Sequence, residues 1–214
     1  MAVRVKVCGV TDPANARLAV ELGADYLGLN FYRASPRFVE PARALEIAAE
    51  VRGRVTLVGV FVNHSPREVE DLAGRVGLDL LQFSGDEAAD VVAPFAGWAL
   101  KVFRTGGLPG SEALAAYRDV WGILLDAPHG SLYGGTGAGW DYGAISAEAP
   151  GLAGQRVFLA GGLGPDNVRR AIASSRPFAV DVCSRVESSP GIKSPELLRR
   201  LFEEVRNGEI PTNP

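Results

Sequence analysis

Residues 3–31 read VRVKVCGVTDPANARLAVELGADYLGLNF, in which two strand-like runs flank a helix-like run. Apolar and polar residues alternate over 3–8, and a second β-rich run follows at 25–31. Pro13 fits the first position of a helix, and Gly23 fits the left-handed residue that often ends one. The stretch therefore predicts a strand, a helix and a second strand in succession.

The same alternation continues to the end of the chain. Prolines again stand where the next helices are expected to begin, and Ser65 with Glu68 predicts a capping box. An open doubly wound sheet is the alternative, but eight units of about 27 residues fill the 214-residue chain. The sequence therefore predicts an α/β fold, a single (β/α)8 TIM barrel over 1–206, with a C-terminal tail at 207–214. The further strands are expected at 55–62, 78–82, 98–103, 120–126, 156–160 and 177–182, and the helix-starting prolines are Pro41, Pro66, Pro165 and Pro195.

Composition excludes several classes of function. The net charge of −3 leaves no basic surplus for a nucleic-acid partner. No apolar run approaches the roughly 20 residues of a membrane span, and the N-terminus lacks a signal-peptide pattern, so we expect a soluble cytoplasmic protein with no membrane partner. The two cysteines make no disulfide framework, and no His/Cys/carboxylate cluster has metal-ligand spacing, so no metal site is predicted.

Two candidate catalytic residues stand at predicted strand ends. Val3, Val5 and Val7 share one face of the first strand, which leaves Lys6 and Cys8 on the face that points into the barrel. Asp126 ends the sixth strand, and barrel enzymes build their sites at these C-terminal ends. Each residue alone has an ordinary structural explanation. Together, on strands that are not neighbours, they predict an acid/base pair with substrate between them.

Glycine-rich loops predict a phosphate site. Gly161 and Gly162 follow the seventh strand, and the eighth strand leads through Asp181 to Ser184 and Arg185. In barrels these two loops often bind phosphate through backbone N–H groups. The run GGTGAG at 134–139 matches neither a dinucleotide fingerprint nor a P-loop, and we expect a loop over the site there.

Nine segments, in order along nearly the whole chain, resemble the phosphoribosylanthranilate isomerases of tryptophan biosynthesis. The resemblance implies an Amadori rearrangement of N-(5-phosphoribosyl)anthranilate to 1-(2-carboxyphenylamino)-1-deoxyribulose 5-phosphate. It implies no cofactor and a small-molecule substrate as partner. We expect a monomer or homodimer. The segments are KVCGVTD (6–12), SPRFVEP (35–41), VGVFVN (58–63), LLQFSGDE (80–87), KVFR (101–104), LLDA (124–127), GGTGAGWDY (134–142), LAGGLGPDNV (159–168) and DVCSRVESSPGIK (181–193).

The resemblance also implies roles for single residues. Cys8 is the implied general base and Asp126 the implied general acid. Arg37 is the implied partner of the anthranilate carboxylate, which suits a planar guanidinium. Because a free thiol is mostly protonated near neutral pH, we expect Lys6 to help lower the pKa of Cys8. The implied phosphate-binding residues are Gly161, Gly162, Asp181, Ser184 and Arg185.

The chain departs from the family pattern in two places. Phe83 and Ser84 stand where Leu-His is usual, so a histidine there cannot be essential in this chain. Cys183 and Arg185 stand where Ser and Gly are usual. Because the eighth strand of a closed barrel lies beside the first, we expect Cys183 near Cys8 and predict oxidative inactivation through the pair.

Three other functions remain open from the residues. An indoleglycerol-phosphate synthase needs a catalytic lysine at a strand end, for which Lys101 is the one candidate. A histidine-pathway isomerase uses paired aspartates, whereas here the first strand ends in Cys8. A non-catalytic barrel that only binds a phosphorylated ligand requires neither Cys8 nor Asp126, so the presence of both favours an enzyme.

Overall fold

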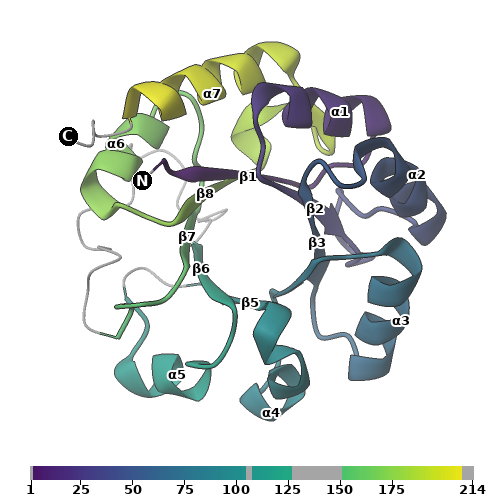
Figure 1. Ribbon diagram of the computed structural model, residues 1–214, viewed down its shortest axis with the longest axis vertical. Helices are drawn as coiled ribbons and strands as arrows, with labels where there is room; N and C mark the ends of the chain where they lie inside the picture. Colours follow the sequence, from purple (N-terminus) through teal and green to yellow (C-terminus); the bar gives the residue numbers. More distant parts are fainter. Residues whose placement is uncertain (1, 105–107, 127–150, 209–214) are drawn as a thin grey trace.

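The computed structural model describes residues 2–104, 108–126 and 151–208. Eight parallel strands form a closed ring in which each strand pairs with the next and β8 pairs with β1 (Figure 1). The predicted TIM barrel is therefore confirmed. The strands are β1 (Arg4–Cys8), β2 (Tyr26–Asn30), β3 (Thr56–Phe61), β4 (Leu80–Phe83), β5 (Ala99–Arg104), β6 (Gly122–Asp126), β7 (Val157–Ala160) and β8 (Ala179–Val182).

Helices surround the ring of strands (Figure 1). The last one continues to Gly208, so the predicted tail at 207–214 begins two residues too early, and 209–214 lie outside the described residues. A short hairpin, β9 (Glu187–Ser189) and β10 (Ile192–Lys193), follows a 3-10 turn at Ser184–Val186 after β8. The helices are α1 (Pro13–Leu22), α2 (Pro41–Val51), α3 (Pro66–Val76), α4 (Ala89–Val92), α5 (Ser111–Ala116), α6 (Val168–Ser175) and α7 (Pro195–Gly208), with a 3-10 helix at Ala93–Trp98.

Local sequence signals set most helix ends. Proline opens α1, α2, α3 and α7 as predicted, and the capping box of Ser65 and Glu68 is present at α3. Gly23 ends α1 with φ of 108°, a left-handed conformation that glycine adopts without strain.

The prediction for Pro165 was wrong, because α6 begins three residues later at Val168. The Asn167 side chain donates to the Gly162 carbonyl at 2.9 Å and accepts from the Gly164 amide at 2.8 Å. These bonds hold the preceding residues in a turn, which competes with the helix.

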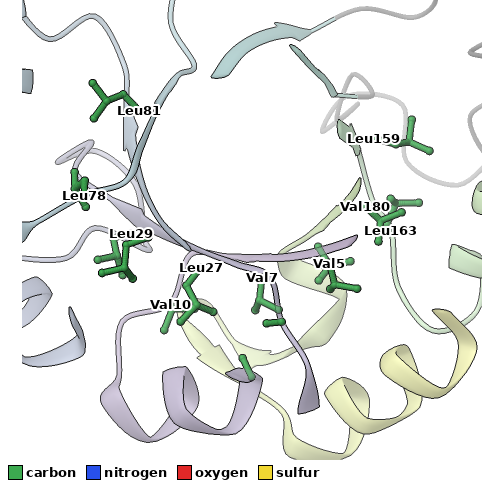
Figure 2. Close-up of a cluster of buried hydrophobic side chains, with 14 of the residues drawn as sticks. Val5, Val7, Val10, Leu27, Leu29, Leu78, Leu81, Leu159, Leu163 and Val180 are labelled. Carbon is green, nitrogen blue, oxygen red and sulfur yellow. The ribbon is translucent and has the colours of Figure 1, made fainter. Parts of the chain in front are cut away.

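The strands separate two apolar layers. Valines and leucines on their outer faces pack against the helices, as Figure 2 shows for Val5, Val7, Leu27 and Leu29. A second cluster fills the inside of the barrel, where Tyr26 and Phe158 meet edge to face with ring centroids 5.2 Å apart. Because Tyr26 is the first residue of β2, this inner apolar cluster lies towards the N-terminal ends of the strands. Polar inward-facing residues are thereby left for the C-terminal mouth.

No helix in the described ranges is long and apolar enough to cross a membrane.

Candidate active site

Cys8 ends β1 on the barrel's inner face, and its neighbour on β2 is a glycine. Cys8 and Gly28 are register partners. A Cβ atom placed on Gly28 would lie 2.8 Å from the Cys8 Sγ and 3.2 Å from the Lys6 Nζ. Distances below 3.0 Å are not tolerated between such atoms, so the glycine provides the space that the thiol and the ammonium group occupy.

A buried ion pair lies one layer below the thiol. Lys6 and Asp181 are register partners on β1 and β8, and the fully buried Lys6 Nζ donates to Asp181 Oδ1 at 3.0 Å. Burial opposes the charge on Lys6, but the negative charges of Asp181 and Cys8 outweigh it and raise the Lys6 pKa. Lys6 therefore stays a cation beneath the mouth.

Asp181 has an unusual affinity for its proton. Burial is the largest cause, and the charges of Cys8 and Asp126 add to it, while Lys6 opposes it; together they raise the pKa of Asp181 to about 7. The sequence assigned Asp181 to the phosphate loops. Its carboxyl faces Lys6 inside the barrel.

The surroundings of Cys8 favour its thiolate form. A hydrogen bond from Cys183 is the largest cause that lowers the Cys8 pKa, and the charges of Lys6 and Lys193 act in the same direction, although burial opposes them. Lys6 thus lowers the Cys8 pKa in the expected direction, through its charge and through a hydrogen bond. The hydrogen bond with Cys8 and burial raise the pKa of Cys183, which keeps its proton.

Asp126 ends β6 at the same mouth. It shares a strand face with Leu124, which belongs to the inner cluster, so its side chain belongs to the inward-facing row. Its charge contributes to the raised pKa of Asp181, so the two carboxyl groups interact electrostatically. Cys8 and Asp126 therefore stand at the C-terminal ends of two strands of one barrel that are not neighbours.

The two loops expected to hold phosphate lie side by side. Gly161 and Gly162 have φ of 97° and 65°, which few residues other than glycine adopt. A Cβ on Gly164 would lie 2.8 Å from the Arg185 Cβ, so the loop after β7 touches the turn that Ser184 opens after β8. The Arg185 guanidinium is exposed and donates to Asp166 Oδ2 at 3.3 Å.

Arg37 approaches the mouth from the loop between β2 and α2. Its Nε lies 3.0 and 3.1 Å from the two Glu187 carboxylate oxygens, and its Nη2 donates to Oε2 at 2.7 Å. A Cβ on Gly9 would lie 2.6 Å from the Arg37 Cδ and 3.1 Å from the Cys183 Sγ. Gly9, with φ of 69°, thus lets the arginine and the second thiol approach the end of β1.

Comparisons with known proteins show which family the chain belongs to. A family model described as "N-(5'phosphoribosyl)anthranilate (PRA) isomerase" matches residues 5–204. The N-(5'-phosphoribosyl)anthranilate isomerase of Bordetella parapertussis is 41% identical over 213 residues, which cover 97% of either chain. The chain belongs to the phosphoribosylanthranilate isomerase family.

Solved structures of the family agree with the fold. The phosphoribosylanthranilate isomerase of Thermotoga maritima superposes with a TM-score of 0.87 at 36% identity, over 96% of this chain and 99% of that one. A phosphoribosylanthranilate isomerase in complex with reduced 1-(o-carboxyphenylamino)-1-deoxyribulose 5-phosphate gives 0.82 at 34% identity, with the same coverage. The chain is therefore an isomerase of tryptophan biosynthesis.

The competing function that relied on Lys101 finds no support in this isomerase. Lys101 alternates with inward-facing Leu100 and Val102, so its side chain points away from the barrel interior. Its Nζ donates to Glu87 Oε2 at 2.7 Å and to the Gly85 carbonyl at 2.9 Å. The lysine that an indoleglycerol-phosphate synthase would need is therefore absent from the mouth among the described residues.

The sequence assigned no role to Glu187 and Lys193, whose charged groups are buried in the β9–β10 hairpin of the isomerase. The Lys193 Nζ donates to Glu187 Oε1 at 2.7 Å and lies 4.0 Å from the Cys183 Sγ. Glu187 also contacts Arg37, and Lys193 contacts Cys183, so the ion pair lies between the arginine and the second thiol. The signal was present, because Glu187 and Lys193 flank the Pro190-Gly191 turn and such turns pair residues across a hairpin.

Gln82 on β4 and Ser84 just after it line the mouth, and both were also given no role in binding. Both are buried, and Gln82 Nε2 donates to Ser84 Oγ at 3.0 Å. Within the described residues, Gln82 Oε1 is the buried side-chain oxygen without a hydrogen-bond partner. Ser84 therefore occupies the place of the usual family histidine with a group that cannot exchange protons near neutral pH.

Proposed function

We propose that this isomerase rearranges N-(5-phosphoribosyl)anthranilate with Asp126 as general acid and Cys8 as general base. The observation that carries the proposal is the pairing of a thiolate-stabilising environment at the end of β1 with a carboxyl at the end of β6. A substrate lying across the mouth can touch both groups in turn. Neither group is needed for binding alone, which disfavours a non-catalytic barrel.

Asp126 acts first. The furanose ring oxygen needs a proton before the bond between it and C1 can break, and Asp126 supplies this proton. The ring opens to a Schiff base, with the former ring oxygen as a hydroxyl. The neighbouring carboxyl of Asp181 favours a proton on this pair of acids, since two adjacent negative charges repel.

Cys8 acts second. The Schiff base makes the C2 proton acidic, and the Cys8 thiolate removes it to give an enolamine. The ketone forms when C1 gains a proton and the C2 hydroxyl loses one, so the rearrangement moves hydrogen without net gain or loss. Lys6, buried 3.0 Å from Asp181, supplies a fixed positive charge below the thiolate throughout.

Arg37 holds the aromatic end of the substrate. Glu187 occupies the Nε and Nη2 side of the guanidinium and so fixes its plane. A planar, fixed guanidinium suits an anthranilate carboxylate, or the ring by stacking. We assign the phosphate to the backbone around Gly161, Gly162 and Ser184, where the loops after β7 and β8 meet. Arg185 adds a positive charge at the rim, and Asp181 takes no part in phosphate binding.

The test is an assay on phosphoribosylanthranilate with Cys8→Ser and Asp126→Asn beside the wild type. Each variant should lose about 10²–10⁴-fold in kcat, the usual contribution of one acid or base. Arg37→Lys should raise KM more than it lowers kcat, because it keeps the charge but loses the planar fork. Retention of kcat within a few-fold in either of the first two variants, with the fold intact by circular dichroism, would refute the assigned role.

A further inference from the structure

We propose that Cys8 and Cys183 are a reversible oxidation site, in which a peroxide closes a disulfide between β1 and β8 and stops the isomerase. The loss of activity rests on the proposed role of Cys8, whereas the disulfide itself does not. The two thiols come from opposite ends of the sequence and meet because the barrel closes between β8 and β1.

The register of β1 and β8 puts the two cysteines about one strand spacing apart, which is close to the separation that a disulfide needs. β1 and β8 are parallel neighbours, and Val7 pairs with Val182, so Cys8 and Cys183 are the next residues along this register. Neighbouring strands lie about 4.8 Å apart. Disulfides bridge Cα atoms about 4.4–6.8 Å apart. No large backbone movement is therefore required.

The side chains already face one another. The two thiol groups lie close enough that each shifts the pKa of the other. The ideal Cβ position of Gly9 lies 3.1 Å from the Cys183 Sγ, and that of Gly28 lies 2.8 Å from the Cys8 Sγ, so a glycine borders each sulfur where a side chain would crowd it. Both cysteines are partly exposed at the mouth, which admits a small oxidant.

The first chemical step is attack of the Cys8 thiolate on hydrogen peroxide. The S–O bond forms as the O–O bond breaks, and the leaving hydroxide takes a proton to become water. Cys8 is then a neutral sulfenic acid. Cys8 reacts before Cys183 because the thiolate, not the thiol, is the nucleophile.

The second step is attack of the Cys183 sulfur on the sulfenic acid. The S–S bond forms, the S–O bond breaks, and the hydroxide leaves with the Cys183 proton as a second water. The two sulfurs together give up two electrons, which reduce one peroxide to two waters. A dithiol reverses the change by exchange, which returns both thiols.

Oxidation of Cys8 removes a cause that raises the pKa of Cys183, which favours the second step. While Cys8 is a thiolate, its hydrogen bond and its charge are among the causes that raise the Cys183 pKa, and Lys193 and Arg37 oppose them. Formation of the neutral sulfenic acid removes the charge of Cys8 and leaves the two cations in place. Lys193 Nζ lies 4.0 Å from the Cys183 sulfur and can stabilise its thiolate. Glu187 Oε1 lies 4.0 Å from the same sulfur and can accept its proton.

The experiment treats the full chain with a small excess of hydrogen peroxide and follows activity and intact mass together. In the wild type we expect loss of the mass of two hydrogen atoms, loss of both free thiols, at least a tenfold fall in activity, and recovery with dithiothreitol. In Cys183→Ser, dimedone should trap the Cys8 sulfenic acid. Without the trap, further oxidation should make the loss of that variant's own starting activity irreversible.

The outcomes separate this proposal from the catalytic one. Absence of a disulfide in the oxidised wild type, or equal recovery of activity in Cys183→Ser, overturns the oxidation site and leaves the catalytic assignment standing. A fully formed disulfide with activity retained overturns the role of Cys8 as base and, with it, the loss of activity proposed here.

Discussion

The isomerase contains two buried lysine–carboxylate pairs that differ in what surrounds the carboxylate. Lys101 and Glu87 lie outside the barrel wall, 2.7 Å apart, and Lys6 and Asp181 lie inside it, 3.0 Å apart. Both lysines are almost fully buried. The two pairs look alike by distance and burial, yet they behave in opposite ways as acids.

Glu87 is held as an anion. Burial opposes its charge, but the hydrogen bond from Lys101 and the backbone bonds outweigh it and lower the Glu87 pKa. The amides of Asn63 and Gly85 donate to Glu87 Oε1 at 2.9 and 3.0 Å. Burial is the largest cause that raises the pKa of Asp181, to about 7, and its two negative neighbours, Cys8 and Asp126, add to it against the opposing effect of Lys6. The comparison teaches that what surrounds each salt bridge, backbone donors at Glu87 and negative charges at the buried Asp181, distinguishes a group that holds a fold from one that exchanges protons.

The largest effect is expected from breaking the outer pair. Lys101→Met leaves Glu87 ionised and buried, with only backbone donors as partners. We expect the free energy of unfolding to fall by about 3–5 kcal/mol, the usual cost of an uncompensated buried charge. Urea unfolding measures this loss, and kcat per folded molecule should stay near the wild-type value. A loss below about 1 kcal/mol would show that Glu87 sheds its charge easily and that the two pairs are alike.

The inner pair should tolerate the same substitution better. In Lys6→Met, Asp181 can take up a proton near neutral pH, so we expect a loss of only about 1–3 kcal/mol. The larger consequence is chemical, because removal of the Lys6 charge raises the pKa of Cys8. The rate of iodoacetamide labelling against pH measures that pKa. An unchanged labelling profile would show that Lys6 does not lower the pKa of Cys8.

The sequence predicted the fold because its signals are local. Alternation of apolar residues, prolines at helix starts and strand-end polar groups each act within a few residues, and the ring of strands follows from their order. Cys8 and Asp126 could be placed at one mouth for the same reason. The helix start predicted at Pro165 was wrong, because the Asn167 side chain binds the backbone of the preceding turn and the helix begins after it.

The rest of the site depends on contacts between distant segments. Asp181 pairs with Lys6, 175 residues away in the sequence. The two side chains meet because the register between β8 and β1 makes these residues partners. Glu187 meets Arg37 across 150 residues. No local pattern contains these pairings. Proximity of Cys183 to Cys8 was predictable only because a closed barrel makes its first and last strands neighbours.

The two carboxylates should also differ in how they couple stability to pH. Asp181 binds its proton more tightly in the folded state, about 7 against the ordinary 3.8, so its contribution is complete below pH 3.8 and is lost as pH rises through 7. Glu87 has the opposite sign: its contribution is present above its ordinary value of 4.5 and is lost as pH falls through its lowered folded pKa.

Unfolding measured in urea from pH 4 to 8 tests this difference. Wild type minus Asp181→Asn should lose stability with rising pH, at a slope below about 1.4 kcal/mol per pH unit, the limit for one proton. Wild type minus Glu87→Gln should gain stability from pH 4 to about pH 5.5, as the carboxyl of the unfolded chain loses its proton, and should be flat above that. Parallel curves for the two differences would contradict the opposite acid behaviour of the pairs.

The smallest effect is expected from the thiol that touches Cys8. Cys183→Ala removes the hydrogen bond that contributes most to the lowered Cys8 pKa, whereas Cys183→Ser keeps a donor. One hydrogen bond is worth about 0.5–1.5 kcal/mol, which converts to a rise of up to about one unit in the Cys8 pKa. Labelling of Cys8 against pH should therefore shift upwards in the alanine variant and by less in the serine variant. If both variants label as the wild type does, the hydrogen bond from Cys183 does not lower the Cys8 pKa, and the charges of Lys6 and Lys193 alone do so. The inner pair would then differ from the outer pair through charges only.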